Sequence, residues 1–519
     1  MSRNTRRILQ NGMCPDMKRK FAAVILFIAL VVLGYESDGY SRRRAAVHAP
    51  KFNVTKEVIP GFPEPNTPEI LNRVGYYRYY LRGQRNPSIL VLVSGYISGA
   101  GYFDNMARNL VKRGNVEVWT INRRETFMEN RELMRKDIRE FLRYPSRRKA
   151  VIARMNDVSR YLRHDGACMR HWGLQVQMED IGRVIREARE RSSSVFLGGW
   201  SDGGEFLMAY TNYKFSDGHF GYQDLAGVVF LDVDPEWAVY SGKTERIERA
   251  INRHREAIEK DRLYVSVSPG LPVYTMAVEL ARIYPGRKSP LAEYFGVPRT
   301  LLKKGITNRA LGGWLFDYTV SDYERSRRSP FAYFIRSGDI RVPAQTRRHR
   351  RRAMVDWRSH HSTGEVTNLD MFLRANSAPG HMFELFYPRK LIQDFWSIAK
   401  TGFHCPELNV YHTPENRLPL FNAQTRANYD TAILPDIVTW YMNRSGIRKE
   451  LVANHHFPSY SHADIFFASP ADREFFSPLY RWMRAASSNV GRVSPEMENR
   501  RSPGVTGRRC TGEERIHRN

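Results

Sequence analysis

The chain has 519 residues, enough for two or three ordinary domains or for one large enzyme that carries an insertion. Hydrophobic residues make up 42% of it and aromatic residues 12%, so a sizeable core can form and a wholly disordered chain is excluded. Its 81 Lys and Arg against 54 Asp and Glu give a net charge of +27, which exceeds what solubility requires and is compatible with an anionic partner.

Residues 1–40 have the pattern of an export signal. The basic triplet Lys18-Arg19-Lys20 precedes residues 21–33, an apolar run without charge or proline. At about 1.5 Å per helical residue this run spans roughly 20 Å, short of the roughly 30 Å hydrocarbon core of a bilayer. A cleaved signal peptide is therefore favoured, and an uncleaved N-terminal anchor is the alternative. We expect a protein that is exported (periplasmic, secreted or in the secretory pathway) or held to the membrane by this segment.

The 4 cysteines are too few for a disulfide framework and lack the C-x-x-C spacing of a structural zinc site. In an exported protein Cys168 and Cys405 are able to form one bridge, because Cys14 lies in the predicted signal and Cys510 in a polar tail. Two isolated buried thiols are the alternative.

Strands and helices alternate in residues 60–236, where we expect the first part of the folded core. In the expected helix at 176–191, five apolar residues fall on one face at helical spacing. Arginine-rich turns are expected between residues 122 and 176. The alternation predicts a mostly parallel sheet flanked by helices. The expected strands are 74–81, 88–96, 116–122, 195–199 and 226–233, the other expected helices are 103–112 and 203–213, and the five apolar residues are Met178, Ile181, Val184, Ile185 and Ala188.

The alternation stops in residues 237–404, which are rich in arginine and aromatic residues and contain no long hydrophobic strand. We expect a mainly helical cap here, inserted between two strands of the core. The basic run at 347–352 is expected to be a solvated loop, and contact with an anionic membrane surface or an acidic substrate is the functional alternative. Nucleic-acid binding is not favoured, because the chain carries an export signal and no recognisable nucleic-acid fold.

The core resumes in residues 405–484, with an expected strand at 407–413 and a closing helix at 471–484. Residues 485–519 contain few apolar positions, so we expect a disordered tail.

The most specific motif is Gly199-Trp-Ser201-Asp-Gly203, which directly follows an expected buried strand and directly precedes an expected helix. This is the strand-turn-helix setting that a G-x-S-x-G nucleophile motif requires. The flanking glycines allow the strand and helix to pack closely around a strained serine. The helix N-terminus directs its amide dipoles at negative charge that develops beside the serine.

From this motif onward the chain resembles the α/β-hydrolase superfamily, over roughly residues 74–236 and 405–484. The resemblance implies a catalytic serine, acid and histidine in that chain order. Ser201 matches the nucleophile. His462, in the segment Pro458-Ser-Tyr-Ser-His-Ala-Asp before the closing helix, resembles the family's histidine loop. His455 and His456 are reserve candidates, which otherwise are surface residues at the end of a strand.

The acid has two candidate positions. Aligning the family's acid turn with residues 412–419 places Glu415 at that position, although relatives usually carry aspartate there. The rivals are Asp232 and Asp234, directly after the strand that follows the nucleophile, where some members of the fold place their acid. Either aspartate is otherwise a helix cap or a structural turn residue.

The resemblance also implies an oxyanion hole made of two backbone N–H groups. One belongs to Asp202, the residue after the nucleophile. The other is assigned to Tyr96, in the loop after the strand at 88–93. Relatives often have His-Gly in this loop, whereas this chain has Ser94-Gly95, so Ser94 either replaces the histidine or simply ends the strand.

The sequence therefore predicts an exported serine hydrolase that cleaves a carboxylic ester, of a lipid or another acyl compound, through an acyl-enzyme. The resemblance implies no metal and no organic cofactor. An acyltransferase, a depolymerase or a peptidase on the same fold remains an alternative. So does a non-catalytic hydrolase-like binding protein. A fluorophosphonate probe separates this last class from the enzymes.

Overall fold

The computed structural model describes residues 51–233, 244–265, 267, 269–317, 331, 333–341, 354–358, 366–425 and 437–490. From Phe52 onward these residues belong to one compact unit. Four sequence-based expectations concern residues outside the described ones: the export signal at 1–40, Asp234, the basic run at 347–352 and the tail from 491.

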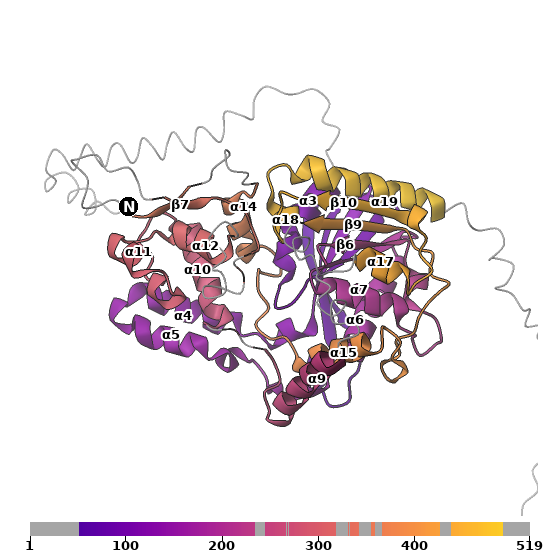
Figure 1. Cartoon of the computed structure of the whole chain (residues 1–519), viewed down its shortest axis with the longest axis horizontal. Helices are drawn as coiled ribbons and strands as arrows, with labels where there is room; N and C mark the ends of the chain where they lie inside the picture. Colours follow the sequence, from indigo (N-terminus) through magenta and orange to yellow (C-terminus); the bar gives the residue numbers. More distant parts are fainter. Residues whose placement is uncertain are drawn as a thin grey trace, which may run out of the picture. The chain divides into compact units, whose positions relative to one another are not determined.

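The core is an eight-stranded sheet in the order β1-β2-β4-β3-β5-β6-β9-β10 (Figure 1). β2 is antiparallel to both of its neighbours, and the remaining neighbours are parallel. This mostly parallel sheet flanked by helices confirms the α/β-hydrolase fold class. The strands are β1 Phe52–Pro60, β2 Arg73–Leu81, β3 Ser88–Val93, β4 Val116–Asn122, β5 Val195–Trp200, β6 Gly227–Leu231, β9 Leu420–Thr425 and β10 Val452–Phe457.

Helices cover both faces of this sheet. Figure 1 shows α3 and α19 on one face and α6 and α7 on the other. These helices and the shorter ones near the C-terminus are α3 Asp104–Lys112, α6 Leu174–Arg189, α7 Gly203–Asn212, α17 Ile437–Met442, α18 Asp464–Phe467 and α19 Ser477–Val490.

The central elements follow from their sequences. All six residues of β3 are buried, as expected for a Leu, Ile and Val run covered on both faces. The apolar face expected for 176–191 is buried in α6, from Met178 to Ala188. The closing helix α19 ends at Val490, so it extends six residues beyond the expected end at 484.

One expected strand was misplaced. Residues 407–413 do not join the sheet: a short 3₁₀ helix spans Pro406–Leu408, and Val410 forms only isolated bridges to Tyr213 and Cys405. The strand is β9, whose sequence LFNAQT is half polar. All six of its residues are buried because β9 lies between β6 and β10, so polarity concealed a central strand.

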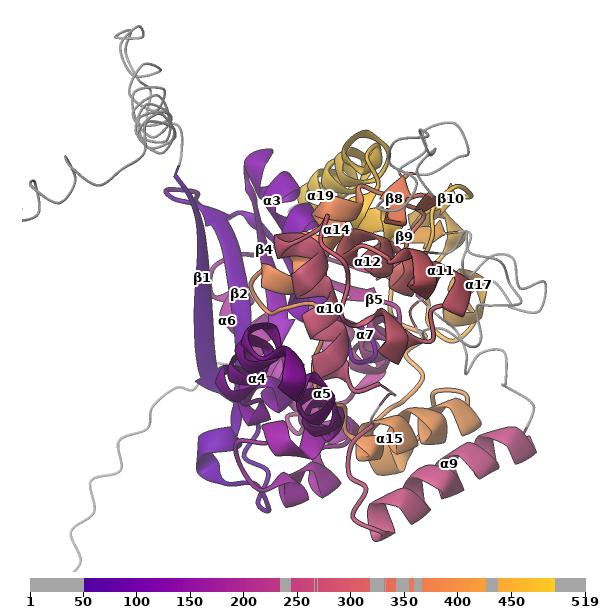
Figure 2. The same cartoon turned by 90° about the vertical axis from the view of Figure 1, so that its left-hand side faces the viewer.

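Between β6 and β9 the described residues are mainly helical, with one small antiparallel pair of strands, β7 and β8. Helix α10 packs against α12 and α14, and α9 packs against α15 (Figure 2). These elements are α9 Thr244–Glu259, α10 Leu271–Ile283, α11 Arg299–Lys304, α12 Asn308–Phe316, β7 Asp339–Arg341, β8 Asp356–Arg358, α14 Leu369–Arg374 and α15 Arg389–Lys400.

The segment between β4 and β5 departs from the expected arginine-rich turns. It contains α4, Arg131–Arg143, and α5, Arg148–Asn156. Helix α5 packs against α10, so residues from a second part of the chain join the inserted helices.

Cys168 and Cys405 are both buried and free, which corresponds to the isolated-thiol alternative. Burial raises the pKa of each thiol to about 11, which keeps both protonated near neutral pH. Among the residues that the structure describes, no three His, Cys, Asp or Glu side chains are grouped so that they hold a metal ion. Within the same residues, no helix is both long and apolar enough to cross a membrane.

Candidate active site

The serine motif forms a sharp turn between β5 and α7. Ser201 has a φ of 56°, in the left-handed region that non-glycine residues rarely adopt. A Cβ on Gly199 would lie 2.0 Å from the carbonyl oxygen of Gly203. A Cβ on Gly203 would lie 2.3 Å from the carbonyl oxygen of Val93. Only glycine fits at either position, so the strained strand-turn-helix bend expected around Ser201, called the elbow below, is present.

Asp232 occupies the equivalent place on the next strand. It directly follows β6, and its φ of 44° is also in the left-handed region. Its carboxylate accepts hydrogen bonds from the backbone N–H and the hydroxyl of Thr425, at 2.7 and 2.8 Å. Because Thr425 ends β9, the third of three adjacent parallel strands, all these groups gather at one edge of the sheet.

His462 is held by Asp232. Its Nδ1 lies 2.6 Å from Asp232 Oδ2, and the two residues are only 1% and 0% exposed. The Nδ1–H donates to the carboxylate, which leaves Nε2 as the nitrogen able to accept a proton. The imidazole also stacks on the indole of Trp200, with ring centroids 4.9 Å apart, and Trp200 precedes Ser201 in the elbow.

The loop that carries His462 is fixed by further hydrogen bonds. Asp464 accepts hydrogen bonds from the backbone N–H of Ser461, at 2.7 Å, and from the Thr367 hydroxyl. Burial is the main cause that raises the pKa of Asp464, to about 7. The inserted segment contributes as well, since the backbone N–H of Ala463 donates to the carbonyl of Phe334 at 2.7 Å.

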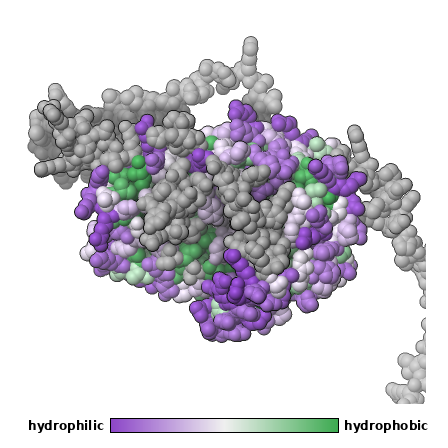
Figure 3. All heavy atoms as spheres, in the orientation of Figure 1, coloured by the Kyte–Doolittle hydropathy of each residue, from purple (hydrophilic) through white to green (hydrophobic). Residues whose placement is uncertain are grey.

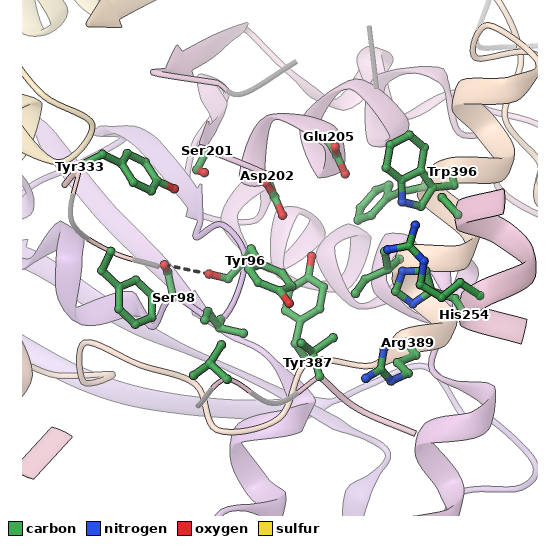
Figure 4. Close-up of a pocket in the computed structure, with 18 of the residues that line it drawn as sticks. Tyr96, Ser98, Ser201, Asp202, Glu205, His254, Tyr333, Tyr387, Arg389 and Trp396 are labelled. Carbon is green, nitrogen blue, oxygen red and sulfur yellow. Dashed lines mark hydrogen bonds between the residues drawn. The ribbon is translucent and has the colours of Figure 1, made fainter. Parts of the chain in front are cut away.

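The loop after β3 lies directly against the elbow. A Cβ on Gly95 would lie 2.7 Å from Ser201 Cβ and 3.1 Å from the backbone nitrogen of Asp202. The Ser94 hydroxyl donates to the carbonyl of Ser98 at 2.6 Å, so Ser94 closes this loop. The Ser98 hydroxyl donates to the carbonyl of Tyr96 at 3.1 Å (Figure 4). The two residues assigned to the oxyanion hole, Asp202 and Tyr96, both line the pocket that contains Ser201.

The structure does not bring Glu415 to His462, because the carboxylate bonded to His462 belongs to Asp232. Glu415 is an exposed turn residue before β9, near Tyr222. Asp232 is one of the rival positions that the sequence offers. The feature of the sequence that points to it is its position directly after β6, at the same strand end as Ser201.

The reserve histidines lie elsewhere, in β10. The ring of His455 stacks on Phe421 with centroids 4.6 Å apart, and His456 is exposed. The structure therefore brings Ser201, Asp232 and His462 to one site, although no hydrogen bond joins Ser201 to His462 within the described residues. Catalytic hydrogen bonds of this kind are often long without substrate and tighten only in the complex.

Ser201 opens into a cavity of about 580 Å³. Figure 4 shows Tyr333 at one end of it, close to Ser201, and His254, Arg389 and Trp396 together at the other end. The rings of Tyr333 and Phe334 contact the His462 ring, with centroids 5.3 and 5.4 Å apart. The inserted elements α9 and α15 and the residues Phe331, Tyr333 and Phe334 therefore form much of the pocket wall.

Comparison with known proteins finds no matching family model and no matching curated protein. Among solved structures, the chain is similar to a thermostable carboxyl esterase from Bacillus coagulans, at 10% identity and a TM-score of 0.42, over 84% of this chain and 100% of that one. It is also similar to a monoglyceride lipase from Saccharomyces cerevisiae, at 10% identity and a TM-score of 0.35, over 86% and 97% of the two chains. A proline iminopeptidase from Mycobacterium smegmatis shares 11% identity with a TM-score of 0.34, over 84% and 100%. Similarity at this level carries no argument about activity, and the fold assignment rests on the strand order and the elbow.

Replacing Gly199 tests the close packing of the elbow. We expect Gly199→Ala to lower the free energy of unfolding by on the order of 3 kcal/mol, because its Cβ would meet the Gly203 carbonyl. Urea unfolding followed by circular dichroism measures the change. Gly286→Ala is the control, because a Cβ there has no neighbour within 4 Å, and it should change stability by less than about 0.5 kcal/mol. Equal effects of the two substitutions would contradict the packing described for the elbow.

The raised pKa of Asp464 predicts that the free energy of unfolding depends on pH. Its pKa rises from 3.8 to about 7 on folding, so between these values the folded chain holds a proton that the unfolded chain has released. The stability that this group contributes is present below the lower value and is lost as the pH rises through about 7. We expect the free energy of unfolding to fall between pH 4 and pH 7 less steeply in Asp464→Asn than in the wild type. Parallel pH profiles would show that Asp464 does not titrate in this way.

Proposed function

We propose that this protein is a serine hydrolase that cleaves a carboxylic ester through an acyl-enzyme. The observation that carries the proposal is the buried hydrogen bond from His462 to Asp232 beside an elbow that presents Ser201 to a cavity. A serine, a histidine and an acid with this connectivity are the parts of a catalytic triad.

The proposed chemistry has two halves. In the first, Ser201 Oγ attacks the ester carbonyl while Nε2 of His462 accepts its proton, and Asp232 stabilises the imidazolium. The backbone N–H groups of Asp202 and Tyr96 stabilise the oxyanion, and the alcohol leaves with the proton from His462. In the second, water loses a proton to His462 and attacks the acyl-enzyme, which releases the carboxylic acid and restores Ser201.

The wall of the cavity supports an ester with an apolar group next to its carbonyl. Phe331, Tyr333 and Phe334 line the cavity beside His462, and Phe331 and Phe334 are at most 5% exposed. Aromatic side chains at this place bind hydrocarbon and keep bulk water from the acyl-enzyme. Lipid esters and other acyl esters fit this surface. Export and contact with an anionic membrane belong to the proposal too, supported by the apolar run at 21–33 and the net charge of +27.

A fluorophosphonate probe tests the nucleophile. We expect the Ser201 Oγ of the purified protein to displace fluoride from phosphorus, which adds the mass of the probe less HF, and Ser201→Ala to form no adduct. Intact-protein mass spectrometry measures both. Labelling that survives in Ser201→Ala would assign the nucleophile elsewhere, and an unlabelled wild type would favour a binding protein.

Substituting the acid tests the triad. Asp232→Asn should lower kcat/KM for a p-nitrophenyl ester by about 10⁴-fold, because an amide favours the wrong tautomer of His462. Glu415→Gln is the matched control and should leave kcat/KM within about twofold of the wild type, since Glu415 is exposed and is not the carboxylate bonded to His462. The opposite pattern of losses would restore Glu415 as the acid.

A further inference from the structure

The end of the cavity far from Tyr333 has a basic wall. Helix α9 contributes Arg246, Arg253 and His254, and α15 begins with Arg389. Residues 246, 250, 253 and 254 all line the cavity and follow the spacing of a single helix face. Figures 1 and 2 both show α9 and α15 side by side, so the two helices together build this wall.

The charges of Arg253 and Arg389 on this wall are not compensated within the described residues. Arg253, His254 and Arg389 form no salt bridge there, and the buried atoms Arg389 Nε and His254 Nδ1 have no hydrogen-bond partner. Burial, followed by the charges of Arg389 and Arg253, lowers the pKa of His254 to about 4. His254 is therefore neutral at pH 7, and the two guanidinium groups remain as the positive charges beside it.

The solvent side of the same helix pair differs. Figure 3 shows hydrophilic residues over α9, in the orientation of Figure 1. There Glu248 of α9 pairs with Lys400 of α15 at 3.0 Å. This solvent-facing pair is balanced across the two helices, whereas Arg253 and Arg389 have no such partner among the described residues. The guanidinium group of Arg389 is partly buried and that of Arg253 is exposed, and two unpaired guanidinium groups on one wall favour a bound anion.

The other residues that line the cavity indicate which end of it an anionic group occupies. Asp202 and Glu205 also line the cavity, and Figure 4 shows Asp202 beside Ser201, so the Ser201 end carries an acidic side chain and the far end the basic ones. The aromatic side chains beside His462 accept an apolar group. The cavity is therefore suited to a molecule that is apolar near its ester carbonyl and anionic at its far end.

We infer that Arg253 and Arg389 form a subsite for an anionic group, carboxylate or phosphate, on the ester that Ser201 cleaves. This inference rests on the proposed function. Both anions suit a guanidinium, which binds two oxygens through paired N–H groups. Neutral esters are then poorer substrates than esters of the same length with a terminal negative charge.

Matched substrates test the subsite. In the first pair, mono-p-nitrophenyl suberate, which has a free carboxylate, is compared with p-nitrophenyl methyl suberate, which is neutral. In the second pair, a monoacylglycerol phosphate is compared with the corresponding neutral monoacylglycerol. We expect kcat/KM to be at least about tenfold higher for the anionic member of one or both pairs. The pair that shows the larger ratio distinguishes carboxylate from phosphate. Ratios near one for both pairs would overturn the inference while leaving ester hydrolysis intact.

Substitutions test whether Arg253 and Arg389 cause the preference for anionic esters. Arg389→Met and Arg253→Met should each lower the anionic-to-neutral ratio at least about fivefold, chiefly through KM for the anionic ester. Arg249→Met is the control, because Arg249 lies on α9, is exposed and does not line the cavity, so its ratio should equal that of the wild type. A ratio that falls equally in all three variants, or in none, would contradict a subsite at these two residues.

A binding measurement separates this inference from the proposed chemistry. Calorimetric titration of Ser201→Ala with suberate and with dimethyl suberate requires no turnover. Tighter binding of suberate, weakened at least about fivefold by adding Arg389→Met, supports the anion subsite even if no ester is cleaved. Equal affinity for the two compounds would overturn it.

Discussion

The hydrogen bond between His462 and Asp232 is the interaction on which the site depends. Both groups are almost completely buried, and a buried imidazole or carboxylate without a partner costs several kcal/mol in similar settings. Each group therefore stabilises the other in the interior. The bond also connects the end of β6 to a loop that follows β10, so it joins segments 230 residues apart in the chain.

Two strained residues place this bond beside the serine motif. Ser201 and Asp232 both have positive φ and follow adjacent parallel strands, so their side chains rise from the same edge of the sheet. Such conformations persist only where the surroundings hold them. Glycine contacts around Ser201 and the two hydrogen bonds from Thr425 to Asp232 provide that support. The inserted segment supports the third member, because Phe334 accepts a backbone hydrogen bond from the residue after His462.

The elbow and the histidine could be predicted because their signals are local: small residues around Ser201 between two regular elements, and a loop before the closing helix. The acid could not be fixed in the same way. Whether Glu415 or Asp232 faces His462 depends on which strand ends are neighbours, and β9 had been misplaced because Asn422 and Gln424 hid a buried strand. Helices α4 and α5 were missed for a related reason, since their many arginines resemble loop sequence although α5 packs on α10.

The most direct test of Ser201 as the nucleophile is a crystal structure of the protein after reaction with an alkyl fluorophosphonate. We expect phosphorus bonded to Ser201 Oγ, its phosphoryl oxygen within hydrogen-bond distance of the backbone nitrogens of Asp202 and Tyr96, and His462 still bonded to Asp232. Phosphorus on another side chain, or a His462 ring turned away from Asp232 toward a different carboxylate, would contradict this assignment.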